Sequence, residues 1–80
     1  MNIFTKPPKL RELGAQADQS YWSVRRMAMA GIIPIVNFPD GQRVDVDWAN
    51  RYVRSGLTDE ELIRYRDEMR RLRSANLPES

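Results

Sequence analysis

The stretch from Ser20 to Gly31, SYWSVRRMAMAG, limits the fold more than any other part of the chain. Serine is a favoured N-cap, because its hydroxyl accepts a hydrogen bond from a backbone N–H of the first helical turn. Glycine is common just beyond the last turn of a helix. The two residues therefore predict a short helix between them. Val24, Met27 and Ala28 share one side of it and form its expected core face, which leaves two adjacent aromatic rings and two arginines outside.

A second short helix is expected upstream, in KLRELGAQA (residues 9–17), where Leu10, Leu13 and Ala17 fall on one face. Pro7-Pro8 is expected to open this helix, because proline is tolerated in the first turn. Gly14 weakens the helix by about 1 kcal/mol relative to alanine, and it would let a neighbouring helix approach closely. Asp18-Gln19 is the turn before Ser20, so the two helices form a helix-turn-helix.

A β-hairpin and a third helix are expected next. Pro39-Asp40-Gly41 is strong turn chemistry between two runs rich in β-branched residues, which predicts strands at Ile35–Phe38 and Arg43–Val46. The following DVDWANRYVRSG predicts a helix that Asp45 or Asp47 caps and Gly56 ends. Trp48 and Tyr52 lie at i and i+4 in it.

The fourth helix is expected over Thr58–Asn76. Thr58 and Glu61 have the spacing of a capping box, and the acidic residues of the first turn and the arginines of the last turn suit the helix dipole. An apolar seam of two heptads runs along the helix at Leu62, Tyr65, Met69 and Leu72. The seam can fold back onto its own domain or meet a second protomer, and we expect protomer contact.

The expected fold is therefore mainly α with a small β-hairpin: a winged helix-turn-helix with an N-terminal arm over residues 1–56, an additional helix over 57–76 and a tail over 77–80. A chain of 80 residues is expected to form one domain. No apolar run is long enough to span a membrane and the N-terminus does not look like a signal peptide, so a cytoplasmic protein is expected by default.

The composition weighs against catalysis. The chain has no cysteine and no histidine, which removes disulfides, zinc–thiolate sites and the commonest general base. The clustered carboxylates are better explained as helix caps, so we expect no enzyme, no metal and no cofactor. Residues 1–57 carry eight Lys or Arg and five Asp or Glu, whereas residues 58–80 carry five Arg and six Asp or Glu. A basic excess suits an anionic partner, although a solvated surface explains the same charges.

In a winged helix-turn-helix, the second helix lies in the major groove of DNA. With Val24 and Met27 inward, the outward side chains of that helix can meet DNA. Arg25 could bind guanine, Arg26 a phosphate, and the hairpin could reach a neighbouring groove as a wing. The candidate DNA-binding residues are Ser20, Tyr21, Trp22, Ser23, Arg25, Arg26, Gln42 and Arg43.

Each of these assignments has an alternative explanation. Trp22 could fold back into a small core, because rings of this size are usually mostly buried. Arg26 could form a structural ion pair with Glu12 or Asp18. Arg43 could simply be solvated.

The segment from Arg11 to Val53 resembles the excisionase family within the MerR-like winged-helix group. Glu12-Leu13 matches the opening of the family pattern, and Ser20 matches its cap serine. Ser23, Val24 and Arg26 correspond to T-V-x-R, and Gly31, Ile33 and Pro34 to G-x-[IL]-P. Gly14, Asp18-Gln19 and Met27 depart from the pattern. The resemblance covers about residues 9–54.

The resemblance implies a protein that binds repeated DNA sites cooperatively and bends the DNA so that an integrase excises a mobile element. The implied partners are double-stranded DNA, an integrase and further copies of the chain on DNA. A small MerR-like transcriptional regulator is the first alternative. A DNA-packaging terminase small subunit and a protein-interaction adaptor are further ones, and the seam on the last helix favours the adaptor.

Overall fold

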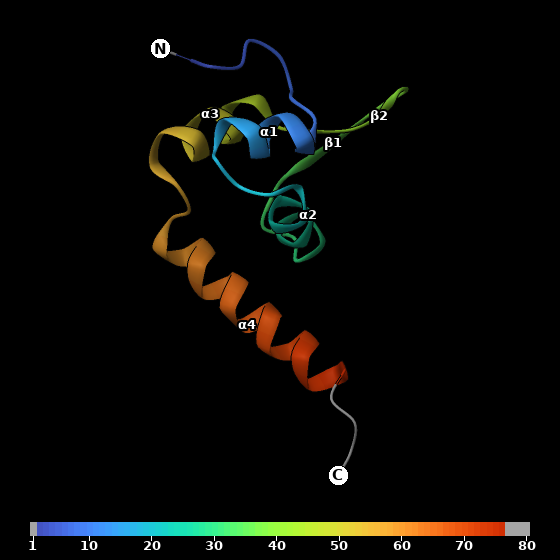
Figure 1. The fold of residues 1–80 in the computed structure, drawn as a ribbon, viewed down its shortest axis with the longest axis vertical. Coiled ribbons are helices and arrows are strands. Elements are labelled where there is room, and N and C mark those ends of the chain that lie inside the picture. Colours follow the sequence, from blue (N-terminus) through green and yellow to red (C-terminus); the bar gives the residue numbers. More distant parts are fainter. Residues whose placement is uncertain (1, 77–80) are drawn as a thin grey trace.

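The computed structural model describes residues 2–76 and has four helices and one hairpin in that range. The elements are α1 (Leu10–Gln16), α2 (Tyr21–Met29), β1 (Ile35–Phe38), β2 (Gly41–Val44), α3 (Val46–Ser55) and α4 (Asp59–Asn76). Figure 1 shows α1 and α3 above α2, the hairpin extending to one side, and α4 leading away below. The expected fold class, a helix-turn-helix with a hairpin and an additional C-terminal helix, is confirmed.

The ends of α2 follow the sequence signals. The Ser23 N–H donates to Ser20 Oγ over 3.1 Å, so Ser20 is the N-cap. After the last turn, Gly31 takes a φ of 78°. The Gly31 N–H donates to the carbonyl of Ala28, and the N–H of Ile32 donates to that of Met27. These two bonds satisfy carbonyls that the helix end would otherwise leave unpaired.

The turn between α1 and α2 depends on a close approach at Gly14. Gly14 is buried, and a Cβ there would lie 2.9 Å from the carbonyl oxygen of Gln19. Asp18 adopts a left-handed conformation with a φ of 55°, which reverses the chain in two residues. The expected close approach of a neighbouring helix at Gly14 is confirmed, because Val24 of α2 lies 3.5 Å from the position of that Cβ.

Two sequence-based boundaries need correction. Helix α1 begins at Leu10, so Pro7-Pro8 precedes it instead of opening it. The carbonyl of Pro8 accepts a hydrogen bond from the Val44 N–H over 2.7 Å, which keeps the prolines extended beside the hairpin. Strand β2 is Gly41–Val44, not Arg43–Val46.

The register explains the second correction. Phe38 pairs with Gly41, so the turn is Pro39-Asp40 alone and the strand starts at once. Asp45 is then free to cap α3 by accepting a bond from the Trp48 N–H over 3.0 Å. The N-cap requirement of α3 therefore ends the strand two residues earlier than its β-branched residues indicate.

The core lies where α1, α2, β2 and α3 meet. Its buried apolar side chains are Leu13, Val24, Met27, Ile32, Ile33, Val44, Ala49 and Tyr52. Buried Asn50 of α3 holds the N-terminal arm, because its amide bonds both the N–H and the carbonyl of Phe4, over 2.8 and 3.0 Å. These two bonds join the N-terminal arm to α3.

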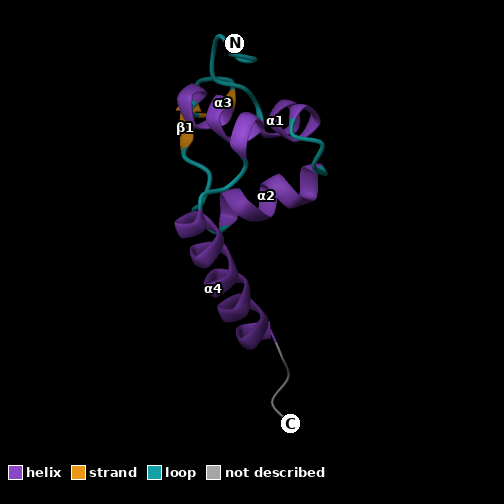
Figure 2. Ribbon diagram, turned by 90° about the vertical axis from the view of Figure 1, so that its left-hand side faces the viewer, coloured by secondary structure: helices purple, strands orange, loops and turns teal. Residues whose placement is uncertain are grey.

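Helix α4 divides into two parts. Tyr65 packs against the core, and Leu57 does so just before the helix begins. Beyond Tyr65 the helix leads away from the other elements, as Figures 1 and 2 both show. The domain itself covers part of the Tyr65 side chain, so this residue of the seam packs on its own core, and contact of the seam with a second protomer stays a prediction. Met69 and Leu72 lie on the part that leads away.

None of the helices in the described part of the chain has the length and hydrophobicity needed to cross a bilayer.

Candidate nucleic-acid interface

The outer side of α2 is an exposed ridge. Trp22 is 68% exposed and Met29 is 73% exposed. Arg25 and Arg26 are exposed as well. Val24 and Met27, one hundred degrees or more away around the helix, are buried. The expected orientation of α2 is confirmed, and Trp22 does not fold back into the core.

Tyr21 is half-buried and organises the first turn of this ridge. Its ring meets the edge of Trp22 at a centroid distance of 5.8 Å. The guanidinium of Arg11 from α1 lies over the same ring, 5.5 Å from its centroid. The phenolic oxygen accepts a bond from Arg25 Nη1 over 3.4 Å. Tyr21 thus brings an arginine of α1 and an arginine of α2 to one place.

An open groove separates α2 from the hairpin. One end is lined by Lys9, Arg11, Tyr21 and Asp40, and the other by Tyr21, Arg25, Met29 and Ile35. Leu10 and Gln42 line both ends, so the two hollows are continuous. Three cationic side chains therefore line this groove beside α2, namely Lys9, Arg11 and Arg25.

Lys9 and Arg11 are functional candidates that the sequence reasoning missed. Lys9 is the N-cap of α1 and Arg11 lies in its first turn, and the sequence predicts only a packing role for this helix. The signal was present, because positions flanking Leu10 on the predicted helix must face away from the core. The turn at Asp18 brings this basic end of α1 beside Tyr21, which no local pattern indicates.

The hairpin presents different side chains from those expected. Arg43 is not at the tip but pairs with Val36 in the ladder. Its guanidinium bonds Asp40 over 2.7 Å and the carbonyl of Pro7 over 3.3 Å, and its side chain is only 19% exposed. The bond from Arg43 lowers the pKa of Asp40, so this carboxylate at the tip stays ionised, and the ion pair with Arg43 balances its charge. Gln42 faces the groove, whereas Arg43 is committed to the hairpin and the arm.

The opposite flank of α2 faces α4. Ser23, Met27 and Gln19 line a second hollow there together with Leu62 and Tyr65 of α4. Ser20 and Ser23 are joined by a hydroxyl–hydroxyl bond of 3.1 Å, so both serve the helix cap. Within the described residues, Arg26 forms no ion pair with Glu12 or Asp18. Helical geometry places Arg26 toward this flank and Arg25 toward the hairpin.

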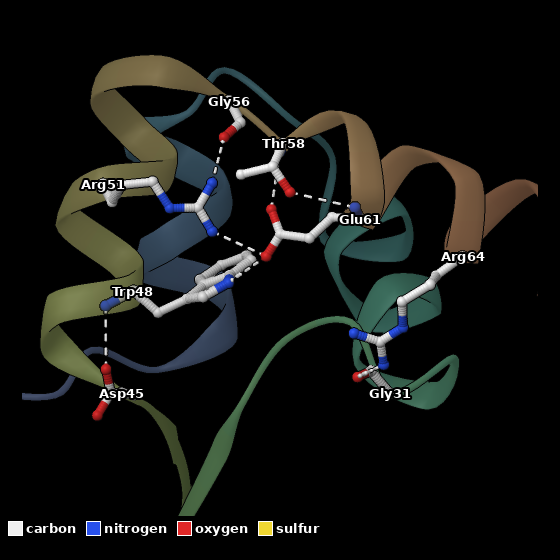
Figure 3. Close-up of polar contacts among 8 residues, drawn as sticks. All are labelled: Gly31, Asp45, Trp48, Arg51, Gly56, Thr58, Glu61 and Arg64. Atoms are coloured by element: carbon white, nitrogen blue, oxygen red, sulfur yellow. Dashed lines mark hydrogen bonds and ion pairs between the residues drawn. The ribbon is translucent and has the colours of Figure 1, made fainter.

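A polar network fixes α4 to α3, as Figure 3 shows. Glu61 Oε2 accepts bonds from Trp48 Nε1 over 2.7 Å and from Arg51 Nη2 over 2.8 Å. Its other oxygen accepts from the Thr58 N–H over 2.8 Å, which completes the expected capping box. Burial raises the pKa of Glu61, but these hydrogen bonds outweigh it and lower the pKa to about 2. Glu61 therefore remains a carboxylate at neutral pH.

Among residues 2–76, no group of three or more acidic side chains is arranged to hold a metal ion. No protein-family model, no curated protein and no solved structure matches this chain. The ridge and the two flanks of α2 are therefore the features of the molecule that bear on its function.

Proposed function

We propose that the protein binds double-stranded DNA in a sequence-directed manner, with α2 in the major groove. The observation that carries this proposal is the ridge, where Trp22 and Met29 are mostly exposed between two exposed arginines. Large apolar side chains on a protein surface are typical of binding sites, and arginines beside them suit an anionic partner. The major groove is wide enough to admit one helix.

The roles of the side chains follow from their positions. Trp22 and Met29 can contact thymine methyl groups or sugars, and Arg25 can reach guanine with two hydrogen bonds. Arg26 can bind a phosphate. Gln42 lines the groove between α2 and the hairpin, so it can approach the backbone beside that groove. Arg43 is held by Asp40 and Pro7, which makes it a weaker candidate than Gln42.

The resemblance to excisionases suggests the biological role. An excisionase would bind repeated sites cooperatively, bend the DNA and assist an integrase, whereas a small regulator would change transcription from a promoter at its site. A reporter assay with the selected DNA sequence placed at a promoter tests the regulator role. A terminase small subunit also binds DNA, so an excision assay with the candidate integrase is the decisive second measurement.

The first prediction tests the ridge. Selection from a random duplex library should give a preferred sequence, and fluorescence anisotropy on that sequence should show weaker binding by Arg25→Ala. We expect a cost of about 1–3 kcal/mol and relaxed specificity at one base pair. Trp22→Ala should weaken binding while lowering stability by no more than about 1.5 kcal/mol, since it loses only the edge contact with Tyr21.

Arg54→Ala is the control, because Arg54 is exposed on α3 and lies on neither flank of α2. Two outcomes would contradict the proposal. One is a wild-type protein that selects no sequence, and the other is wild-type affinity in both ridge variants.

A further inference from the structure

Helix α4 carries a stripe of arginines outside the ridge and its hairpin flank. Arg66, Arg70 and Arg73 are exposed, and with Tyr65 and Met69 they line a shallow groove along one side of the helix. Their spacing of four and three residues places them on a single face. Within the described part of the chain, none of the three forms an ion pair.

The other arginines of α4 are engaged differently. Arg64 donates to the carbonyl of Gly31 over 3.3 Å, and Arg71 is paired with Glu68. Arg64 thus holds α4 to the end of α2, and Arg71 is balanced by a carboxylate one turn away. Within the described residues of α4, the stripe therefore presents three exposed arginines that no ion pair balances.

The stripe lies next to the flank of α2 that faces α4. Tyr65 lines both the arginine groove and the hollow that Gln19, Ser23 and Met27 border. The stripe therefore begins where α2 and α4 meet, on the side of α2 opposite the hairpin groove. Figure 1 shows α2 between the hairpin and α4.

The attachment of α4 is stiff at this point. Glu61 binds α3 and Thr58 through three hydrogen bonds, and Tyr65 packs on the core. An uninterrupted helix then carries the stripe away from this anchor. The arginines are therefore held in a fixed direction relative to α2.

A helix in the major groove has one sugar–phosphate backbone on each side, because the groove is only about 12 Å wide. On the hairpin side of α2, Lys9 and Arg11 face one of these backbones in the proposed complex. We infer that Arg66, Arg70 and Arg73 of α4 bind phosphates of the backbone on the other side. This inference rests on the proposed function, and it assigns α4 to DNA rather than to a second protomer.

The test compares neighbouring arginines of the full-length protein on a duplex with one binding site. We expect the slope of log K against log salt to fall by about one for Arg70→Gln and by up to about three for the triple variant R66Q/R70Q/R73Q. Arg71→Gln is the matched control, with the same charge change one residue away on the face paired with Glu68, and its slope should stay near the wild-type value. Circular dichroism should show the same helix content in all variants.

Ethylation interference gives a second measurement. Phosphates on one side of the major groove should weaken wild-type binding when ethylated but should no longer affect the triple variant. An unchanged salt slope in the triple variant overturns the inference. So does a triple variant that binds one site normally but loses cooperative binding to repeated sites, which would indicate contact between protomers. If the wild-type protein does not bind DNA at all, the proposed function itself fails.

Discussion

At the scale of single residues, Glu61 shows how one side chain can join two helices. Its carboxylate accepts from Trp48, Arg51 and Thr58, and its side chain is only 13% exposed. Arg51 also donates to the carbonyl of Gly56 over 2.8 Å and lies over the ring of Trp48. The carboxylate of Glu61 and its partner Arg51 therefore join α3, the linker and the start of α4.

This arrangement predicts a pH-dependent stability. The pKa of Glu61 is lowered to about 2 from its ordinary value of 4.5, so its contribution is complete above pH 4.5 and is lost as the pH falls through 2. Glu61→Gln should lower the free energy of unfolding by about 1.5–3 kcal/mol at neutral pH. The difference from wild type should shrink between pH 4.5 and 2.

Urea unfolding of both proteins across this pH range measures the effect. Glu60→Gln is the control, because Glu60 is an exposed neighbour in the same helical turn. Parallel curves for wild type and Glu61→Gln at every pH would show that the carboxylate does not stabilise the junction.

At the scale of elements, the helix-turn-helix depends on the absence of a side chain at Gly14. Replacing Gly14 with alanine should improve helix propensity by about 1 kcal/mol. It should nevertheless destabilise the protein, because the new Cβ would lie 2.9 Å from a backbone oxygen that cannot move alone. Overpacking of this kind costs about 1–3 kcal/mol.

Thermal unfolding of Gly14→Ala beside Gln16→Ala provides the measurement. Gln16 is exposed on the same helix, so its replacement should leave stability unchanged or slightly higher. A Gly14→Ala protein more stable than wild type would mean that the turn relaxes without cost.

At the scale of the whole molecule, the first turns of α4 belong to the domain. Leu57 and Tyr65 pack on the core, and Glu61 and Arg64 bond α3 and Gly31. A chain that ends at Gly56 should therefore be less stable, by at least the roughly 1.5–3 kcal/mol of the charged hydrogen bonds at Glu61. The sequence-based boundary, which ends the DNA-binding domain at residue 56, gives the opposite expectation for this truncation.

A second truncation, after Arg73, makes this prediction specific. It retains Leu57, Glu61, Arg64 and Tyr65, so its midpoint in denaturant should match that of the full chain. If the chain ending at Gly56 were equally stable, α4 would be an appendage and not a part of the domain.

Much of the fold could be predicted because its signals are local. Ser20, Gly31 and Thr58 mark helix ends through bonds to residues at most four positions away, and the structure bears out each of them. The strand boundary at Val44 could not be predicted in this way. Two local signals competed there, and the cap formed by Asp45 ended the strand early.

The sequence by itself determined the order of the elements and the buried face of α2, and it favoured an outward Trp22, because helical periodicity fixes which side chains share a side. Only the tertiary structure decided what lies beside that ridge. Arg11 reaches Tyr21 because of the turn at Asp18. Arg43 points away from the ridge side because its guanidinium bonds Asp40 and the carbonyl of Pro7 in the N-terminal arm. Tyr65 packs against the core of its own domain, whereas the arginines of the stripe beyond it stay exposed. These outcomes depend on packing between segments distant in the chain, which no local pattern encodes.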